Sequence, residues 1–218
     1  MIQCLYMDQK INYYKISRIE LAKLDKNNKK SLLLHACCGP CACFPLLDLC
    51  PYFNVTIYFN NSNIYPSEEY FRRLEELKKL LEIYKKEYGY DIKIIETNYN
   101  NDDYNKFLDI YGDIKEGGIR CFSCYEKRMD EAYRFANENN FDYFTTVMSI
   151  SRQKNSQKLN EIGEKLSQKY PNTKYFYSDF KKNKGLEIGT SLRKKYNLYN
   201  QQYCGCIYSY KEYLTRKK

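Results

Sequence analysis

The sequence predicts an α/β protein in which helices flank a parallel sheet. Five short apolar or β-branched segments alternate with helix-like segments of about a dozen residues; the five cover 31–36, 54–60, 91–96, 142–148 and 174–177. This alternation is typical of parallel strands joined by right-handed crossovers. The length of 218 residues is enough to bury a sizeable core without disulfide support.

The first strand is predicted at 31–36, an apolar run suited to burial on both faces of a sheet. Residues 1–30 are a polar N-terminal extension of unknown role, with a short helix expected at 11–20. We expect residues 31–218 to form a single α/β domain. A cysteine-rich turn follows the first strand, and the next helix is predicted at 44–50 with Pro45 in its first turn.

The clearest amphipathic helix is predicted over 67–88. Ser67 is expected to cap its N-terminus, and Gly89 to end it. Apolar residues recur there at steps of three or four, namely Phe71, Leu74, Leu77, Leu81, Tyr84 and Tyr88. This spacing predicts a helix with one buried face.

Further helices are predicted at 124–139, 155–169 and 185–195. The polar segment 99–120 has aromatic residues at helical spacing, and the tail 199–218 carries the last cysteine pair and a basic end. Basic runs in this half of the chain are possible contacts for a nucleic-acid backbone, at 181–184, 193–195 and 216–218.

The composition excludes several classes of protein. No apolar run approaches the roughly 18 residues of a membrane-spanning helix. The first ten residues lack the pattern of a secretory signal, so we expect a cytoplasmic protein whose ten cysteines are reduced thiols. His35 is the single histidine, which excludes zinc catalysis by histidine ligands and favours a supporting role beside a site. The formal charge of +9 makes an RNA partner plausible.

Seven of the ten cysteines fall in three tight groups at turns or element ends. The groups are Cys37, Cys38 and Cys41; Cys121 and Cys124; and Cys204 and Cys206. Cys4, Cys43 and Cys50 stand apart from them and are expected to be small structural residues. Such turns can direct several sulfur atoms toward one point, so the seven grouped cysteines predict a metal or redox site.

Three kinds of chemistry fit this spacing. Cys38 and Cys41 with Cys121 and Cys124 could form a structural zinc site. Cys38-Gly-Pro-Cys41 alone also fits a thiol–disulfide enzyme, in which a helix N-terminus lowers the pKa of a thiol. An iron–sulfur cluster would use four thiolates and leave three for a second metal with an open position.

Several motifs along the chain, taken together, match a known family. They are His35-Ala-Cys-Cys-Gly-Pro-Cys41, Asn61-Ser-Asn-Ile-Tyr-Pro66, Glu69-Tyr70 with Arg73, Cys121-Phe-Ser-Cys-Tyr125 with Arg128, and Tyr203-Cys-Gly-Cys206 with Ser209. In this order, over roughly residues 31–210, the pattern resembles the cobalamin-independent epoxyqueuosine reductases. Asn200 departs from it, because that position is usually basic in the family.

The resemblance implies a Rossmann-like parallel sheet related to the adenine-nucleotide alpha hydrolases, with the cysteine turn in place of the nucleotide loop. It implies the last step of queuosine synthesis, in which the epoxide on a tRNA wobble base takes up two electrons and loses its oxygen as water. The implied cofactors are a [4Fe-4S] cluster and an adjacent mononuclear metal, with iron expected. The implied partners are the tRNA bearing epoxyqueuosine and a low-potential electron donor, and no membrane is expected.

Under this resemblance, we expect the seven cysteines to divide into two ligand sets. The cluster set would be Cys37, Cys121, Cys124 and Cys206, and the second-metal set Cys38, Cys41 and Cys204. Some members of the family carry aspartate at the position of Cys41, which suits a ligand of the single metal.

The remaining site residues are expected to act on the substrate. Candidates for the general acid that protonates the leaving oxygen are Tyr65, Tyr125 and Glu126. Candidates for substrate binding are Asn61, Asn63, Arg120, Arg128 and Arg193. The alternative functions are a zinc-binding module that recognises nucleic acid and a thiol–disulfide oxidoreductase using Cys38 and Cys41.

Overall fold

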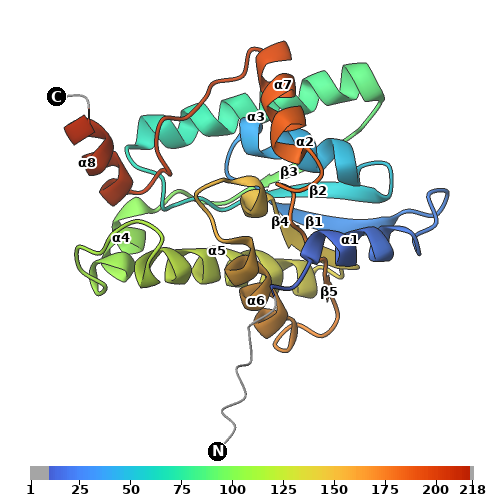
Figure 1. Cartoon of the computed structure of the whole chain (residues 1–218), viewed down its shortest axis with the longest axis horizontal. Helices are drawn as coiled ribbons and strands as arrows, with labels where there is room; N and C mark the ends of the chain where they lie inside the picture. Colours follow the sequence, from blue (N-terminus) through green and yellow to red (C-terminus); the bar gives the residue numbers. More distant parts are fainter. Residues whose placement is uncertain (1–9, 217–218) are drawn as a thin grey trace, which may run out of the picture.

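The computed structural model describes residues 10–216 and contains one parallel sheet of five strands (Figure 1). The spatial order is β3-β2-β1-β4-β5. The strands are β1 (Lys30–His35), β2 (Phe53–Phe59), β3 (Lys93–Glu96), β4 (Tyr143–Thr146) and β5 (Lys174–Tyr175). The predicted α/β class and the parallel sheet with flanking helices are therefore confirmed.

Helices cover both faces of the sheet (Figure 1). One face carries α2 (Gly39–Leu49), α3 (Ser67–Tyr88) and α7 (Gly185–Lys195), and the other carries α5 (Ile119–Glu138) and α6 (Ser156–Ser167). Leu32 and Leu34 of β1 join the first core and Leu33 the second, because successive side chains of a strand point to opposite faces. In the described part of the chain, no helix combines the length and apolar character needed to cross a bilayer.

Shorter helices complete the fold: α1 (Tyr13–Leu21), α4 (Asn101–Asp109), α8 (Ile207–Arg216) and a 3-10 turn at Val147–Ile150. Helix α1 packs against the main body. The Arg18 guanidinium forms a two-point ion pair with Asp48 at 2.7 and 2.5 Å, and the Tyr13 ring stacks on Tyr177 at 5.5 Å. The division of the chain at residue 30 stays a prediction.

Several predicted helix boundaries are wrong. Helix α2 begins at Gly39, so Pro45 lies inside the helix and not in its first turn. Gly39 allows the start of α2 to pack closely on α3, because a Cβ there would lie 2.7 Å from the carbonyl oxygen of Glu76. Pro66, and not Ser67, caps α3, whereas Gly89 ends it in a left-handed conformation as predicted.

The buried face of α3 also differs from the prediction. Phe71 is 55% exposed, and its neighbour Tyr70 is buried at 3%, because Tyr70 packs on Phe59 of β2. Helix α5 begins at Ile119, five residues earlier than predicted, and it includes the whole second cysteine pair. Helix α8 in the tail was not predicted. These differences arise from contacts between segments that are distant in the sequence.

The contact between α6 and β5 gives a test of this packing. A Cβ on Gly163 would overlap the ring of Tyr175, which is buried in the core. We expect Gly163→Ala to lower the free energy of unfolding in urea by about 1–3 kcal/mol, the usual cost of an overpacked core. Gly189→Ala in α7 is the matched control, because the nearest atom to its Cβ would lie at 3.5 Å. We expect no destabilisation there; equal losses in both variants would contradict the packing.

Candidate metal centre and substrate pocket

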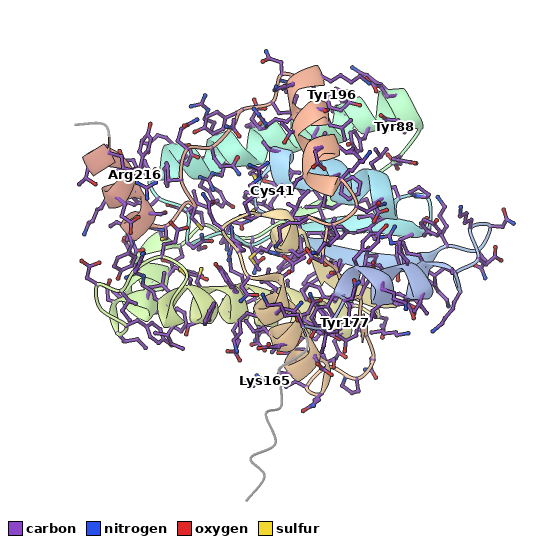
Figure 2. All side chains as sticks on the ribbon, in the orientation of Figure 1. Cys41, Tyr88, Lys165, Tyr177, Tyr196 and Arg216 are labelled. Carbon is purple, nitrogen blue, oxygen red and sulfur yellow. The ribbon has the colours of Figure 1, made fainter. Side chains whose placement is uncertain are left out.

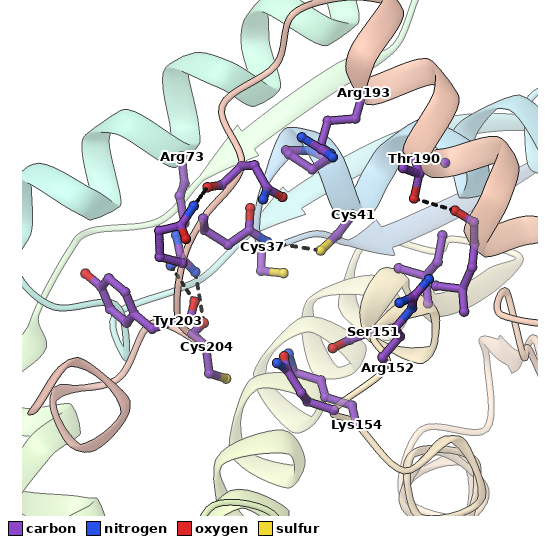
Figure 3. A pocket seen from close by; sticks show the side chains of 18 residues that line it. Cys37, Cys41, Arg73, Ser151, Arg152, Lys154, Thr190, Arg193, Tyr203 and Cys204 are labelled. Atoms are coloured by element: carbon purple, nitrogen blue, oxygen red, sulfur yellow. Dashed lines mark hydrogen bonds between the residues drawn. The ribbon is translucent and has the colours of Figure 1, made fainter. Parts of the chain in front are cut away.

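The site lies at β1, where the chain changes from adding strands on one side of β1 to adding them on the other side. Strand β1 pairs with β2 on one side and with β4 on the other, so the carboxyl ends of β1 and β4 are adjacent. Parallel α/β sheets bind ligands at such switch points. A cavity of about 270 Å³ opens there, lined by the turn after β1, the loop 151–154, helix α7 and the segment 200–204. Figure 3 shows Cys37, Cys41 and Cys204 along this cavity, with Arg193 on one side and Arg152 and Lys154 on the opposite side.

Cys37, Cys38 and Cys41 form a thiol triad near the middle of the molecule, where Figure 2 labels Cys41. Their sulfur atoms lie within 4.8 Å of one another, and the Cys37 and Cys38 sulfurs are 4.0 Å apart. Three sulfurs on one tetrahedral metal, at about 2.3 Å each, would be about 3.8 Å apart. The triad therefore fits a single metal ion. Hydrogen bonds from Cys38 and Cys41 hold the pKa of the Cys37 thiol well below its ordinary value.

Cys121 and Cys124 lie in the first two turns of α5. The Cys121 sulfur accepts a hydrogen bond from the backbone N–H of Gly117 at 3.2 Å, and the Cys124 sulfur accepts one from the Tyr104 hydroxyl at 3.5 Å. Burial raises the pKa of the Cys121 thiol, and the nearby Cys204 and Cys124 thiols raise it further. The second and third cysteine groups are thus neighbours in space.

Cys204 and Cys206 lie immediately before α8. Burial, followed by the effect of Cys204, raises the pKa of the Cys206 thiol to about 11, and Cys124 adds to this. All three cysteine groups therefore stand at the start of a helix: α2, α5 or α8. The amino end of a helix carries partial positive charge, which stabilises thiolates.

A buried ion pair fixes the backbone that carries Cys204. Arg73 in α3 is 1% exposed and bonds to Glu69 at 2.7 Å. Its other nitrogens donate to the carbonyl oxygens of Cys204 at 2.9 Å and Tyr203 at 3.0 Å. Gly205 adopts a positive φ of 131°, and a Cβ there would lie 2.9 Å from the Arg73 guanidinium. The pair thus holds the last cysteine group against α3.

Three further basic side chains are buried around the site without a carboxylate partner. Arg120, Arg128 and Lys154 are 3%, 2% and 8% exposed, and none forms an ion pair with a carboxylate among residues 10–216. Burial alone would lower the pKa of Lys154, but the Cys204 and Cys37 thiolates outweigh it and raise that pKa. The same balance, with Cys124 the strongest partner, raises the pKa of Arg128. Buried charges require partners of opposite sign, and the neighbouring thiols supply them for Lys154 and Arg128 once they are ionised.

The residues predicted to bind substrate occupy different environments. Asn61 is fully buried, donating to the carbonyl of Ala36 at 2.8 Å and accepting from Arg128 at 3.3 Å. Asn63 is 2% exposed, and its side-chain oxygen has no partner in the described residues. Arg120 donates to the carbonyl of Gly112 at 2.8 Å and stacks over Tyr208. Arg193 is half-buried and lines the cavity.

The three candidates for the proton donor also lie in different surroundings. Tyr125 is 3% exposed and lies near Lys154 and Cys204; burial, above all, raises its pKa. Glu126 pairs with Lys165 of α6 at 2.9 Å on the outer surface of the helix layer. The Tyr65 ring packs edge-on against Tyr210 of α8. Of the three, Tyr125 is the one that the structure brings into electrostatic contact with the cysteines.

His35 and the isolated cysteines behave as supporting residues. Burial and the charge of Arg128 lower the pKa of His35 to about 3, so it is a neutral group beside the triad. Its Nδ1 lies 2.8 Å from the Thr146 hydroxyl. Cys43 and Cys50 are buried, and burial raises the pKa of each thiol to about 12. Cys4 lies outside the described residues.

Sequence reasoning missed three residues that line the cavity. Lys154 and Arg152 lie in the loop that follows β4, and Gln201 precedes the last cysteine group. The Gln201 amide donates to the sulfurs of Cys38 at 3.1 Å and Cys41 at 3.5 Å, while its oxygen has no partner among the described residues. Lys154 and Arg152 could have been found from the sequence, because they follow β4, the strand that pairs with β1 at the switch point.

Some of the residues in the predicted basic runs form contacts within the fold. Lys181 donates to the carbonyls of Ser149, Ser151 and Lys154, and thereby holds the loop that carries Lys154. Lys195 pairs with Glu87 at 2.6 Å. Lys217 and Lys218 lie outside the described residues. Of the predicted backbone contacts, Arg193 faces the site.

Comparisons with known proteins agree with the motifs. The family model described as epoxyqueuosine reductase QueH matches residues 32–212. The chain is similar to an epoxyqueuosine reductase QueH of Staphylococcus epidermidis, with 37% identity over 93% of this chain and 86% of the relative. The Staphylococcus aureus relative of the same name is 37% identical over 93% and 85%. The Streptococcus pyogenes relative is 36% identical over 94% and 80%.

The Glu69–Arg73 pair predicts a large effect on stability. We expect Arg73→Met to lower the free energy of unfolding by about 3–5 kcal/mol, because it leaves the buried Glu69 without its cationic partner and frees two carbonyls. Arg73→Lys should lose less, since it keeps the charge but not the fork of donors. The adjacent, exposed Arg72→Met is the control and should change stability by less than about 1 kcal/mol in the same urea titration. Similar losses in both methionine variants would contradict this account.

Proposed function

The chain belongs to the epoxyqueuosine reductase QueH family, and we propose that it reduces epoxyqueuosine to queuosine at the wobble position of tRNA. The observation that carries the proposal is the meeting of two cysteine groups on a cavity at the switch point of the sheet, through Cys37, Cys41 and Cys204, with Cys121 of the remaining group near Cys204. The buried cations around these thiols support it, because they suit a centre that is negatively charged. The names of the relatives support the reaction and an oxidoreductase activity.

The donor set suits two metal groups. The thiol triad suits a single ion, for which iron is proposed, and the four remaining grouped cysteines suit a [4Fe-4S] cluster, which takes four thiolates. When bound, these groups would supply single electrons and a Lewis acid that polarises the epoxide. The sequence analysis expected Cys37 as a cluster ligand and Cys204 as a ligand of the second metal. The grouping of the sulfurs favours the reverse, with Cys37 on the single metal and Cys204 on the cluster.

The chain's own residues would adjust the charge of this centre. Lys154 and Arg128 place fixed positive charge beside the thiolates and favour the extra negative charge of a reduced state. The Gln201 amide donates to two sulfurs of the triad, and hydrogen bonds to metal-bound sulfur stabilise the more negative oxidation state. These groups hold their places through the buried contacts described above.

The reaction consumes two electrons and two protons, breaks both epoxide C–O bonds, forms a carbon–carbon double bond and releases the oxygen as water. Tyr125 is the proton donor that the arrangement supports best among the three candidates, because it lies near Cys204 and Lys154, whereas Glu126 pairs with Lys165 on the outer surface and Tyr65 packs against Tyr210. The two electrons would come from a low-potential donor, and the reaction is proposed to take place in the cytoplasm.

The substrate is proposed to enter beside Arg152 and Arg193. Both side chains line the cavity from different elements, and neither forms an ion pair or a hydrogen bond within residues 10–216. Two guanidinium groups at the mouth suit the phosphates on either side of the wobble nucleotide. Asn63, with its unpartnered buried oxygen, is proposed to contact the modified base, and Asn61 is proposed to support substrate binding by holding Arg128 in place.

The activity has a direct test. Anaerobic enzyme loaded with iron and sulfide, incubated with epoxyqueuosine-containing tRNA and a strong reductant, should yield queuosine. Mass spectrometry of the digested nucleosides should show the loss of one oxygen atom, and enzyme stripped of metal should give no product. Unchanged epoxyqueuosine with fully loaded and reduced enzyme would refute the function. A colourless preparation with one zinc would support the zinc-module alternative instead.

The ligand division has its own test. We expect the reconstituted protein to bind about five iron atoms per chain. Cys37→Ala should lose about one of them and keep the visible absorbance of the cluster, whereas Cys204→Ala should lose that absorbance. Cys43→Ala, a buried cysteine outside both sets, should keep the full complement. If Cys37→Ala lost the cluster and Cys204→Ala kept it, the division expected from the sequence would be the correct one.

A further inference from the structure

Four half-buried tyrosines surround a second, smaller cavity next to the site. We call Tyr199, Tyr203, Tyr210 and Tyr213 the tyrosine cluster. The cavity measures about 230 Å³ and lies between the start of α3 and helix α8. The rings of Tyr203 and Tyr213 lie nearly parallel, at 5.4 Å and 25°, and the Tyr210 ring lies 5.3 Å from Tyr203. The described structure thus presents aromatic faces around an open space.

Positive charge accompanies these rings. The guanidinium of Arg72 lies 3.5 Å from the centre of the Tyr199 ring, is exposed, and has no ion pair among the described residues. Two carboxylates also line the cavity. Glu69 is bound to Arg73 and accepts from the Tyr199 hydroxyl at 3.0 Å, whereas Glu68 is exposed and accepts from the Ser67 hydroxyl.

The two cavities are next to each other and share lining residues. Gln202 and Tyr203 line both of them, and Tyr203 directly precedes Cys204. A strand of nucleotides with one base at the thiols would therefore place a neighbouring base within reach of the tyrosine cluster. Packing of α8 explains why the rings touch one another, but it does not explain an open aromatic cavity beside an unpaired guanidinium.

We propose that the tyrosine cluster is a nucleobase subsite that stacks the base next to the modified wobble nucleotide. This rests on the proposed function and adds a second point of RNA recognition. Unpaired bases in RNA loops are commonly held by stacking on aromatic side chains, with arginine above or beside them. A base held at this subsite would fix the direction of the RNA chain across the cavity that holds the thiols.

The test uses full-length tRNA assembled by ligation, with epoxyqueuosine at the wobble position and one abasic nucleotide on its 5′ side, on its 3′ side, or farther away in the loop. With the wild-type enzyme, loss of the stacked neighbour should weaken binding by about 5- to 150-fold. In Tyr210→Leu, the same abasic change should weaken binding less than about 2-fold, because the stacking surface is already reduced.

Tyr52→Leu is the matched control. Tyr52 is also a half-buried tyrosine beneath a cation, Lys26, but it directly precedes β2 and so lies at the amino ends of the strands, opposite the site. It should keep the full penalty for the abasic nucleotide. The Tyr210 hydroxyl makes no hydrogen bond in the described structure. Tyr210→Leu therefore breaks no hydrogen bond and should leave the iron content and the circular dichroism spectrum unchanged.

Two outcomes would overturn the subsite. One is equal affinity of the wild-type enzyme for intact tRNA and for both neighbouring abasic forms. The other is a full abasic penalty in Tyr210→Leu with normal iron content. Binding of intact tRNA without any reduction by the loaded enzyme would instead refute the proposed function, while the stacking result would still decide the subsite.

Discussion

The buried pair of Glu69 and Arg73 is the contact on which the site depends. Its guanidinium reaches from α3 to the backbone of residues 203 and 204, which lie some 130 positions later in the chain. A charge that is 1% exposed must be fully bonded to be tolerated, and this one is bonded to a carboxylate and two carbonyls. The pair therefore fixes where the tail crosses α3. It thereby holds the backbone of the last cysteine group, which lies just before α8.

The second constraint is the balance of buried charge. Arg120, Arg128 and Lys154 bring three positive charges into the interior without carboxylate partners in the described part of the chain. Their cost is offset only if the neighbouring thiols are ionised, as metal ligands are. The buried charges of Lys154 and Arg128 and the ionised thiols around them thus stabilise each other. The cations at the rim, Arg152, Arg193 and Arg72, stay available for an anionic substrate.

Much of this organisation was visible in the sequence. Apolar runs gave the strands, because a strand buried on both faces needs little beyond continuous apolar residues. The three cysteine groups were recognisable because each one lies in a short segment. Composition was less informative: 25 tyrosines could reflect nucleotide bias alone. Only the structure separates the tyrosines around α8 from those of the core, since their role depends on which rings border an open cavity.

The sequence by itself determined the α/β class, and it predicted the turn after β1 as the centre of the site and the seven grouped cysteines as its ligands. These follow from local patterns of hydrophobicity and spacing. The tertiary structure decided which thiols are neighbours, that Glu126 faces outward, and that Lys154 and Gln201 approach the sulfurs. In the structure, α5 begins at Ile119, earlier than predicted, and Pro45 lies inside α2. The physical reason is that burial and pairing depend on segments far apart in the chain, and a local pattern does not contain that information.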